Sequence, residues 1–264
     1  MIDRAIRMIA SSAVAAPADR GPSLAEAAPE ERLISLKRSL DRRYSRVGAG
    51  ELRETFDREN ARDPFRGGFR TLESLSERVL APGTHAAVLS DTSVEVLTYV
   101  RHGDVAQEDS TGVRQELGTG EWGRSSARSG STHRTVNGSP TDPAGTLQCC
   151  FTPDRSSLRT RPEKRHFPIA ERRGILRLVF SPDGRNGSLR LRQNARGYSS
   201  VLDPGRHLIH ELTEGRAAWL QVLSGRIQLI DEVLDAGDGA SFVDESAVSI
   251  TARASSEILL VELT

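Results

Sequence analysis

Short runs of alternating apolar and polar residues fill most of the chain and predict β-strands. Turn sequences rich in glycine, proline, serine and aspartate separate these runs, a rhythm typical of a β-sandwich or barrel and not of a parallel sheet with helices. In the first half, the predicted strands are residues 69–80, 86–90, 94–101, 105–109, 121–128, 132–136 and 145–151. In the second half, they are residues 189–193, 199–202, 207–212, 217–223, 226–230, 240–243, 247–252 and 257–263.

The beginning of the chain has a different pattern. Residues 10–30 are rich in alanine, proline, serine and charge, and they carry too few large apolar groups to offset the entropy of ordering. In residues 30–46 the apolar positions recur near helical spacing, which predicts a surface helix that ends at Gly48 and Gly50. We therefore expect a mobile tail, then a helix, and we expect residues 1–45 to be dispensable for folding.

Residues 181–195 separate two similar halves. Pro182-Asp183-Gly184 and Asn186-Gly187 are two turn signals in a row, and a half-buried strand follows them. The turns on either side recur at nearly one separation: Gly83 with Gly205, Gly103 with Gly225, and Gly120 with Gly237. Such recurrence indicates an internal duplication, with one small β-barrel in each half.

Composition narrows the function classes. The 264 residues include 36 basic and 36 acidic side chains, so there is no net charge to attract nucleic acid or an anionic membrane. No apolar run is long enough to span a bilayer. Cys149 and Cys150 are neighbours and point to opposite faces of a predicted strand, so the sequence has no disulfide framework and fits a reducing cytoplasm.

Several stretches resemble the pirin family of two-barrel cupins. They are VEVLTYVRHGDVAQEDSTG (residues 94–112), GTGEWGRSSARSGSTHRTVN (118–137), SPDGRNGSLRLRQNARGY, AAWLQVLSG and DAGDGASFVDE. The resemblance covers about residues 55–264. It implies an all-β fold of two tandem cupin barrels of the double-stranded β-helix, or jelly-roll, type. We expect a helical or disordered extension at 1–50, a first barrel at 51–153, a basic connector at 154–180, and a second barrel at 181–264.

The resemblance also implies a metal, usually iron, in the first barrel. Pirins hold it with a His-Pro-His triplet and a later His-Ser-Glu triplet, because residues i and i+2 of a strand share one face. Counted without gaps from Gly83, the triplets fall on Leu89-Ser90-Asp91 and His133-Arg134-Thr135. Leu89 cannot ligate a metal and Thr135 is a poor substitute for a carboxylate, so only Asp91 and His133 remain as metal ligands.

Other side chains near these positions leave alternatives open. Glu95 either reaches inward or forms an outward ion pair, and a rearranged metal site of Asp91, His133 and Glu95 is one reading. The other reading is a hydrogen bond between Asp91 and His133. His85 and His102 are expected to be solvated, and Arg124-Ser125-Ser126 is expected to be a surface strand.

Two hypotheses on function follow. In the first, the chain is a pirin-like bicupin without a cofactor that acts as a binding or regulatory module, with Leu89, Asp91, Glu95, His133 and Thr135 as pocket candidates. Its partner is a small aromatic molecule or another protein, and neither nucleic acid nor membrane is expected. In the second, it is an iron-dependent or other divalent-metal dioxygenase of the quercetin 2,3-dioxygenase type. Leu89 and Thr135 favour the first.

Overall fold

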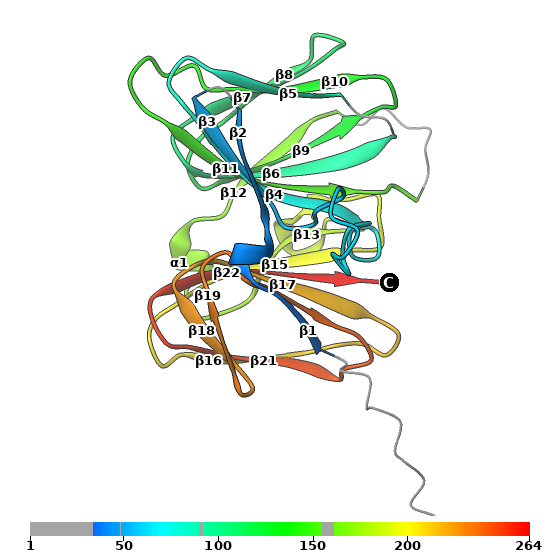
Figure 1. The fold of residues 1–264 in the computed structure, drawn as a ribbon, viewed down its shortest axis with the longest axis vertical. Coiled ribbons are helices and arrows are strands. Elements are labelled where there is room, and N and C mark those ends of the chain that lie inside the picture. Colours follow the sequence, from blue (N-terminus) through cyan, green and yellow to red (C-terminus); the bar gives the residue numbers. More distant parts are fainter. Residues whose placement is uncertain (1–33, 48, 90–91, 155–160) are drawn as a thin grey trace, which may run out of the picture. The chain divides into compact units, whose positions relative to one another are not determined.

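The computed structural model describes residues 34–47, 49–89, 92–154 and 161–264, and its first half forms two facing sheets. The larger sheet has the order β12-β9-β6-β11-β4-β3-β2, and the smaller sheet has the order β5-β10-β7-β8. The strands are β2 (Arg43–Val47), β3 (Gly50–Glu54), β4 (Leu72–Leu80), β5 (His85–Leu89), β6 (Val94–His102), β7 (Val105–Asp109), β8 (Arg114–Leu117), β9 (Glu121–Ala127), β10 (Thr132–Val136), β11 (Ala144–Phe151) and β12 (Glu163–His166) (Figure 1).

The second half repeats this arrangement. Its larger sheet has the order β1-β20-β17-β22-β15-β13-β14, and its smaller sheet has the order β16-β21-β18-β19. The strands are β1 (Ile34–Lys37), β13 (Arg177–Ser181), β14 (Leu189–Arg190), β15 (Arg196–Leu202), β16 (His207–Glu211), β17 (Ala217–Ser224), β18 (Arg226–Leu229), β19 (Glu232–Asp235), β20 (Gly239–Phe242), β21 (Ala247–Ala252) and β22 (Ser256–Leu263).

The strand order confirms the predicted duplication. In the larger sheets β9-β6-β11-β4 corresponds to β20-β17-β22-β15, and the smaller sheets match strand for strand. The turn glycines also correspond, because Gly103 and Gly225 have φ angles of 73° and 81°. A side chain is strained in this left-handed region, and a Cβ on Gly225 would lie 2.1 Å from the carbonyl oxygen of Ser255. The all-β, two-barrel fold is therefore as predicted.

A hydrophobic cluster joins the two barrels. Trp219 of β17 packs against Phe56 and Phe65 of the first half, with ring centroids 4.8 and 5.0 Å apart in edge-to-face geometry. Strand β22 lies between β17 and β15, with Leu259 and Val261 in this cluster and Leu260 on the other face, inside the second barrel. The last strand is therefore buried on both faces, and the barrels share one core.

The predicted helix over residues 30–46 is wrong for its described part. Residues Ile34–Lys37 form β1, which pairs antiparallel with β20 of the second barrel, and β2 pairs with β3 of the first barrel. Between them lies the short 3-10 helix η1 (Ser39–Asp41). Ile34 and Leu36 alternate along the strand and pack against the core of the second barrel, so tertiary pairing overrides the local helical spacing. Residues 1–33, where the mobile tail was predicted, lie outside the described part.

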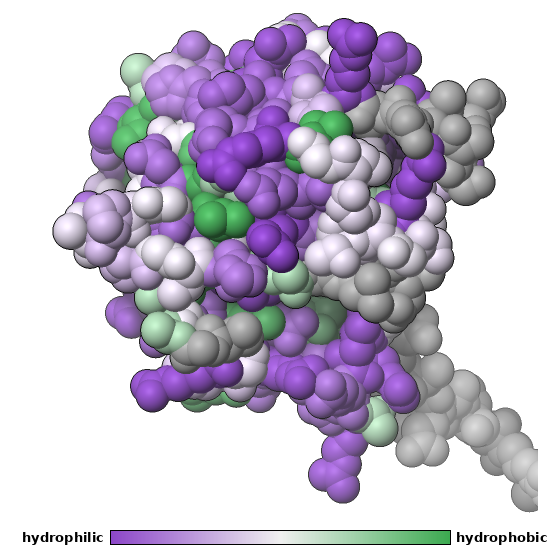
Figure 2. Space-filling model, turned by 90° about the horizontal axis from the view of Figure 1, so that it is seen from above, coloured by the Kyte–Doolittle hydropathy of each residue, from purple (hydrophilic) through white to green (hydrophobic). Residues whose placement is uncertain are grey.

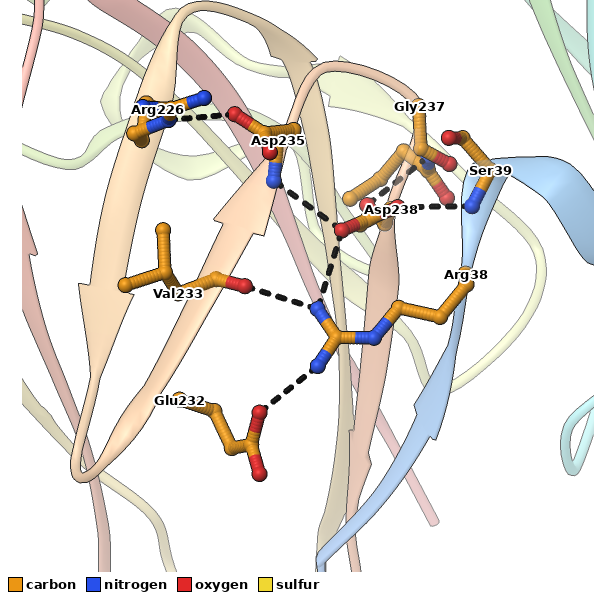
Figure 3. A network of polar contacts seen from close by, with 9 residues as sticks. Arg38, Ser39, Arg226, Glu232, Val233, Asp235, Gly237 and Asp238 are labelled. Atoms are coloured by element: carbon orange, nitrogen blue, oxygen red, sulfur yellow. Dashed lines mark hydrogen bonds and ion pairs between the residues drawn. The ribbon is translucent and has the colours of Figure 1, made fainter.

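Polar contacts fix this N-terminal arm, residues 34–47, to the second barrel (Figure 3). The guanidinium of Arg38 donates hydrogen bonds to the Val233 carbonyl at 2.7 Å and to the carboxylates of Glu232 at 2.7 Å and Asp238 at 3.2 Å. Asp238 also accepts a hydrogen bond from the backbone N–H of Ser39 at 2.7 Å. The arm is therefore bound at both its strand and its turn.

The connector predicted for residues 154–180 contains regular structure in its described part. Strand β12 pairs with β9 in the first barrel, β13 lies in the second, and helix α1 (Ile169–Arg172) stands between them. Arg172, one of the basic residues of this connector, is 2% exposed. It donates hydrogen bonds to the Tyr99 hydroxyl at 3.0 Å and to Glu257 at 2.6 Å, which explains how a buried guanidinium is tolerated.

The two neighbouring cysteines point to opposite faces of one strand, as expected. Cys149 and Cys150 are free thiols in β11, with Cys149 in the cluster between the barrels and Cys150 packed against Val94 and Val96 on the opposite face. Burial raises the pKa of both thiols, which lowers their reactivity. Within the described part of the chain, no helix has the length and apolar character needed to cross a bilayer.

Candidate ligand site in the first barrel

A cleft of about 900 Å³ opens into the first barrel. Its apolar walls include Val94, Ala127, Pro153 and Pro162, and its polar lining includes Gln107, Ser125 and His133. A cleft of this size is in the range that holds a small organic molecule. We call it the first-barrel cleft.

The strand register determines which side chains lie together in the smaller sheet. Thr135 of β10 pairs with Gln107 of β7 on one side and with Ala86 of β5 on the other. Gln107 in turn pairs with Gln115 of β8. Because directly opposite residues in antiparallel strands project to the same face, these residues form one row across the sheet. The neighbouring row contains His133, paired with Asp109 and with Val88.

Amide and hydroxyl groups form a buried network in this barrel. The Gln148 side-chain amide donates hydrogen bonds to the hydroxyls of Thr98 at 3.2 Å and Thr135 at 3.3 Å. The Gln107 amide also donates to the Thr98 hydroxyl. These bonds orient the side-chain amides of Gln107 and Gln148 around the cleft.

Four buried side chains that line the cleft carry polar atoms without a hydrogen-bond partner in the part of the chain that the structure describes. They are Oε1 of Gln107, Oγ of Ser125, both ring nitrogens of His133 and Oε1 of Glu95. Their residues are 2%, 8%, 7% and 2% exposed, respectively. Buried polar groups in native proteins are nearly always hydrogen-bonded to protein, water or ligand. The cleft therefore presents several groups that a polar ligand can satisfy.

His133 is a titratable side chain between Asp109 and Val88 in the second of these rows. Burial lowers the pKa of its imidazole, and the nearby Asp109 carboxylate opposes that effect. The ring is therefore neutral at neutral pH, with one nitrogen as a hydrogen-bond donor and the other as an acceptor.

The second barrel shows that the fold does not need this polar lining. The duplicated strands place Leu220 where the first barrel has Thr98, Leu260 where it has Gln148, and Phe242 where it has Ser125. All three are buried in the hydrophobic core of the second barrel. The second barrel therefore has a hydrocarbon core and the first has a polar cleft, although the two barrels have the same topology.

Glu95 lies where the cleft meets the second half of the chain. Its Oε2 accepts a hydrogen bond from the backbone N–H of Arg192 at 2.6 Å, and its Oε1 lies 3.7 Å from Nη1 of Arg124. Burial raises the pKa of Glu95, against the effect of Arg192 and Arg124. Arg124 and Ser125 are themselves buried, so the expected surface strand is wrong. Ser125 lines the cleft, and Arg124 lies against Glu95 and donates a hydrogen bond to the carbonyl of Arg161 at 2.9 Å.

The predicted site residues are only partly brought together. His133 and Thr135 both lie in the barrel, with Thr135 buried. Leu89 pairs with Thr132, so the register does not place position 89 opposite 133 or 135; Val88 and Ala86 occupy those places. Asp91 lies outside the described residues, so its contact with His133 stays a prediction. His85 and His102 are exposed, as expected.

The donors near His133 provide a test of metal binding. Asp109 is its cross-strand partner, but one oxygen of that carboxylate, Oδ1, accepts hydrogen bonds from the backbone N–H groups of Thr111 and Val113 at 2.8 and 3.0 Å. Although burial opposes them, these bonds lower the pKa of Asp109. Among the described residues, no three His, Cys, Asp or Glu side chains lie close enough together to hold a metal ion.

Sequence reasoning missed Gln107, Ser125 and Gln148. Their signal was available in the internal duplication, because polar residues in the first half stand where the second half has hydrocarbon side chains. Seen from the side of the sheet β5-β10-β7-β8, the described residues on the surface are mostly hydrophilic, and hydrophobic ones form separate spots (Figure 2). The cleft is therefore a better candidate than an apolar surface patch on this face.

Comparison with known proteins agrees with the fold. The model of the quercetinase C-terminal cupin domain matches residues 178–263. A quercetin 2,3-dioxygenase from Escherichia coli K12 is 30% identical over 231 residues, which cover 88% of this chain and 99% of the relative. The pirin-like protein YhaK from the same organism is 29% identical over 218 residues, covering 81% of this chain and 91% of the relative.

Solved structures give the same picture. The bacterial pirin YhhW from Escherichia coli in complex with nickel(II) aligns with a TM-score of 0.77 at 30% identity, covering 87% of this chain and 98% of that one. The structure of YhaK from Escherichia coli aligns with a TM-score of 0.68 at 26% identity, covering 84% of this chain and 93% of that one.

Proposed function

This chain belongs to the pirin family of two-barrel cupins, and we propose that it is a metal-independent binding or regulatory module that holds a small molecule in the first-barrel cleft. The observation that carries the proposal is the state of His133. Its ring is buried in the cleft, neither nitrogen has a hydrogen-bond partner among the described residues, and the paired segment of β5 is Ala86, Ala87 and Val88.

The donor set supports a site without a resident metal. Tight divalent sites in proteins use three or four ligands. Around His133, β10 supplies a hydroxyl at Thr135 that already accepts a hydrogen bond from Gln148, and β7 supplies Asp109, whose carboxylate holds a turn. One neutral imidazole beside these groups does not fit a tight iron or nickel site.

A small organic ligand fits the same groups better. The neutral imidazole of His133 offers one donor and one acceptor, and the hydroxyl of Ser125 offers either. Apolar side chains on the walls, including Val94 and Ala127, would cover the rings of an aromatic molecule. Binding would replace water at buried polar atoms with ligand groups, without any bond being made or broken.

The experiment is a binding titration of the full chain with the flavonol quercetin under nitrogen and with a chelator present. We expect saturable binding without change of the flavonol, and a loss of about tenfold or more in affinity for His133→Ala, since a buried hydrogen-bond partner is removed. His207→Ala is the matched control, because His207 is exposed in the second barrel. Absence of binding, or equal binding by both variants, would overturn the proposal.

The second candidate is a metal-dependent dioxygenase. It is favoured by the relatives that are named quercetin 2,3-dioxygenase and by the nickel complex of a bacterial pirin. In that case a metal would have to recruit ligands beyond those described around His133, and quercetin would be consumed only when oxygen is present. We place either form of the protein in the cytoplasm, where its two free thiols stay reduced.

A further inference from the structure

Two glutamine side chains form a pair of hydrogen-bond acceptors in the first-barrel cleft. Gln107 and Gln115 are direct cross-strand partners in β7 and β8, and both line the cleft. The Oε1 atom of each is buried, and no described residue forms a hydrogen bond with it. Cβ atoms of such partners lie about 4.5–5.5 Å apart, so the two amide groups are neighbours on one face.

At Gln107, a hydrogen bond of the amide nitrogen determines which end of the side chain is left to bind a ligand. The amide nitrogen of Gln107 donates to the hydroxyl of Thr98, which turns the other end of the amide, the carbonyl oxygen, away from that bond. A carbonyl oxygen can only accept a hydrogen bond. A ligand group must therefore donate to it, and the same holds for Gln115.

Charge alone does not decide what enters the cleft. Arg128, Arg161 and Arg192 lie along its rim, but so do Glu108, Asp109 and Glu116. Arg114 is ion-paired with Glu108 and Glu116, and Lys164 is paired with Glu121 at 3.0 Å. The buried lining decides instead, because the carbonyl oxygens of Gln107 and Gln115 can only accept hydrogen bonds and would repel an anion.

We propose that Gln107, with Gln115, determines the ligand class: an uncharged ring compound with hydroxyl groups on adjacent carbon atoms, and not an anion. The inference rests on the proposed function, since it concerns the same cleft. Each hydroxyl donates to one glutamine oxygen, and His133 or Ser125 satisfies the remaining acceptor or donor. Aromatic and aliphatic diols share this chemistry.

Three small probes separate the possibilities by ligand-observed NMR titration of the full chain: catechol, cis-1,2-cyclohexanediol and phthalate. We expect binding of at least one diol and binding of phthalate weaker by about tenfold or more, since unpaired buried acceptors strongly disfavour the wrong partner. Which diol binds more tightly distinguishes an aromatic from an aliphatic ligand.

Gln107→Leu tests the role of this glutamine directly. We expect the fold to accept leucine there, because the second barrel buries Leu229 at the corresponding position. We expect Gln107→Leu, and Gln115→Leu as a second variant, each to weaken diol binding about tenfold and to leave phthalate binding unchanged. Gln228→Leu, outside the cleft, is the control. Diol binding that both cleft variants leave unchanged, or tighter binding of phthalate, would overturn the inference.

The outcome also separates this inference from the proposed function. If quercetin binds but neither diol does, the ligand class is wrong and the binding module stands. If neither quercetin nor a diol binds, both are wrong.

Discussion

The Nζ atom of Lys37 lies 2.7 Å from Oδ2 of Asp63, and the two side chains are 5% and 0% exposed. Lys37 belongs to β1 in the sheet of the second barrel, whereas Asp63 lies in the loop before β4 of the first. Asp63 also accepts hydrogen bonds from the backbone N–H groups of Asp57 and Phe65 at 2.8 and 2.9 Å. A buried ion pair therefore ties the N-terminal arm to the loop that packs between the barrels.

Breaking this pair should destabilise the fold. Lys37→Ala leaves the Asp63 carboxylate buried without its counter-charge, which typically costs about 3–5 kcal/mol. Urea denaturation of the variant should show a correspondingly lower free energy of unfolding. Arg43→Ala is the comparison, since Arg43 forms only partly exposed ion pairs, and we expect a much smaller change in the free energy of unfolding. Equal stability of the two variants would contradict the role of the buried pair.

Truncation should separate the N-terminal arm from the residues before it. A chain that starts at residue 33 retains β1, η1 and β2, and we expect its midpoint of thermal unfolding to stay within a few degrees of the full chain. A chain that starts at residue 48 loses the Lys37 pair and the Arg38 contacts, so it should unfold at a clearly lower temperature. If the shorter chain were as stable as the longer one, the original expectation that residues 1–45 are dispensable would be right after all.

The second barrel should lose stability in acid. Glu262 is 2% exposed and contacts His210 and Arg216, with 3.0 Å between its Oε2 and Nε of Arg216. Although burial opposes them, His210 and the arginines lower the pKa of Glu262. Because the folded-state pKa is depressed, its contribution is present above the unfolded value of about 4.3 and is lost as pH falls through the folded pKa.

Glu262→Gln tests this contribution. We expect a loss of about 3–5 kcal/mol at pH 7, because Arg196 and Arg216 then lack their buried counter-charge, and a weaker decline of stability below pH 4.3. Denaturation curves across pH measure both. Glu214→Gln, at an exposed position, is the control and should leave the acid profile unchanged. If Glu262→Gln lost stability at low pH as steeply as the unaltered protein, Glu262 would not be the cause of the acid sensitivity.

The last strand should be essential to both cores. Leu260 of β22 is fully buried in the second barrel, and truncation of such a side chain to alanine costs about 2–5 kcal/mol. We expect Leu260→Ala to lower the free energy of unfolding by that amount and deletion of residues 257–264 to abolish soluble expression. A folded, soluble deletion product would mean that β22 does not join the two barrels as described.

The repeat of turns made the fold predictable from the sequence. Gly103 and Gly225 need positive φ angles, and such local requirements are visible in the residue types. The N-terminal arm was not predictable in this way, because β1 exists only through its pairing with β20, far along the chain. Leu33 and Leu36 have helical spacing, whereas Ile34 and Leu36 alternate as in a strand. The local pattern therefore does not decide between helix and strand.

The site was only partly predictable. His133 and Thr135 were found by their resemblance to a motif, but their strand partners depend on register, which a gap-free count does not give. Gln107 and Ser125 looked like ordinary surface polar residues. Only the contrast with the hydrocarbon core of the second barrel and their burial in the cleft gives them significance.

The central claim, a cleft that binds without a resident metal, is tested most directly by metal analysis of the protein purified from cells supplied with iron and nickel, together with oxygen uptake in the presence of quercetin. Our account predicts well under one equivalent of either metal per chain and no oxygen uptake above a chelator-treated sample. One equivalent of metal that His133→Ala loses and His207→Ala keeps, with oxygen-dependent consumption of quercetin, would contradict it.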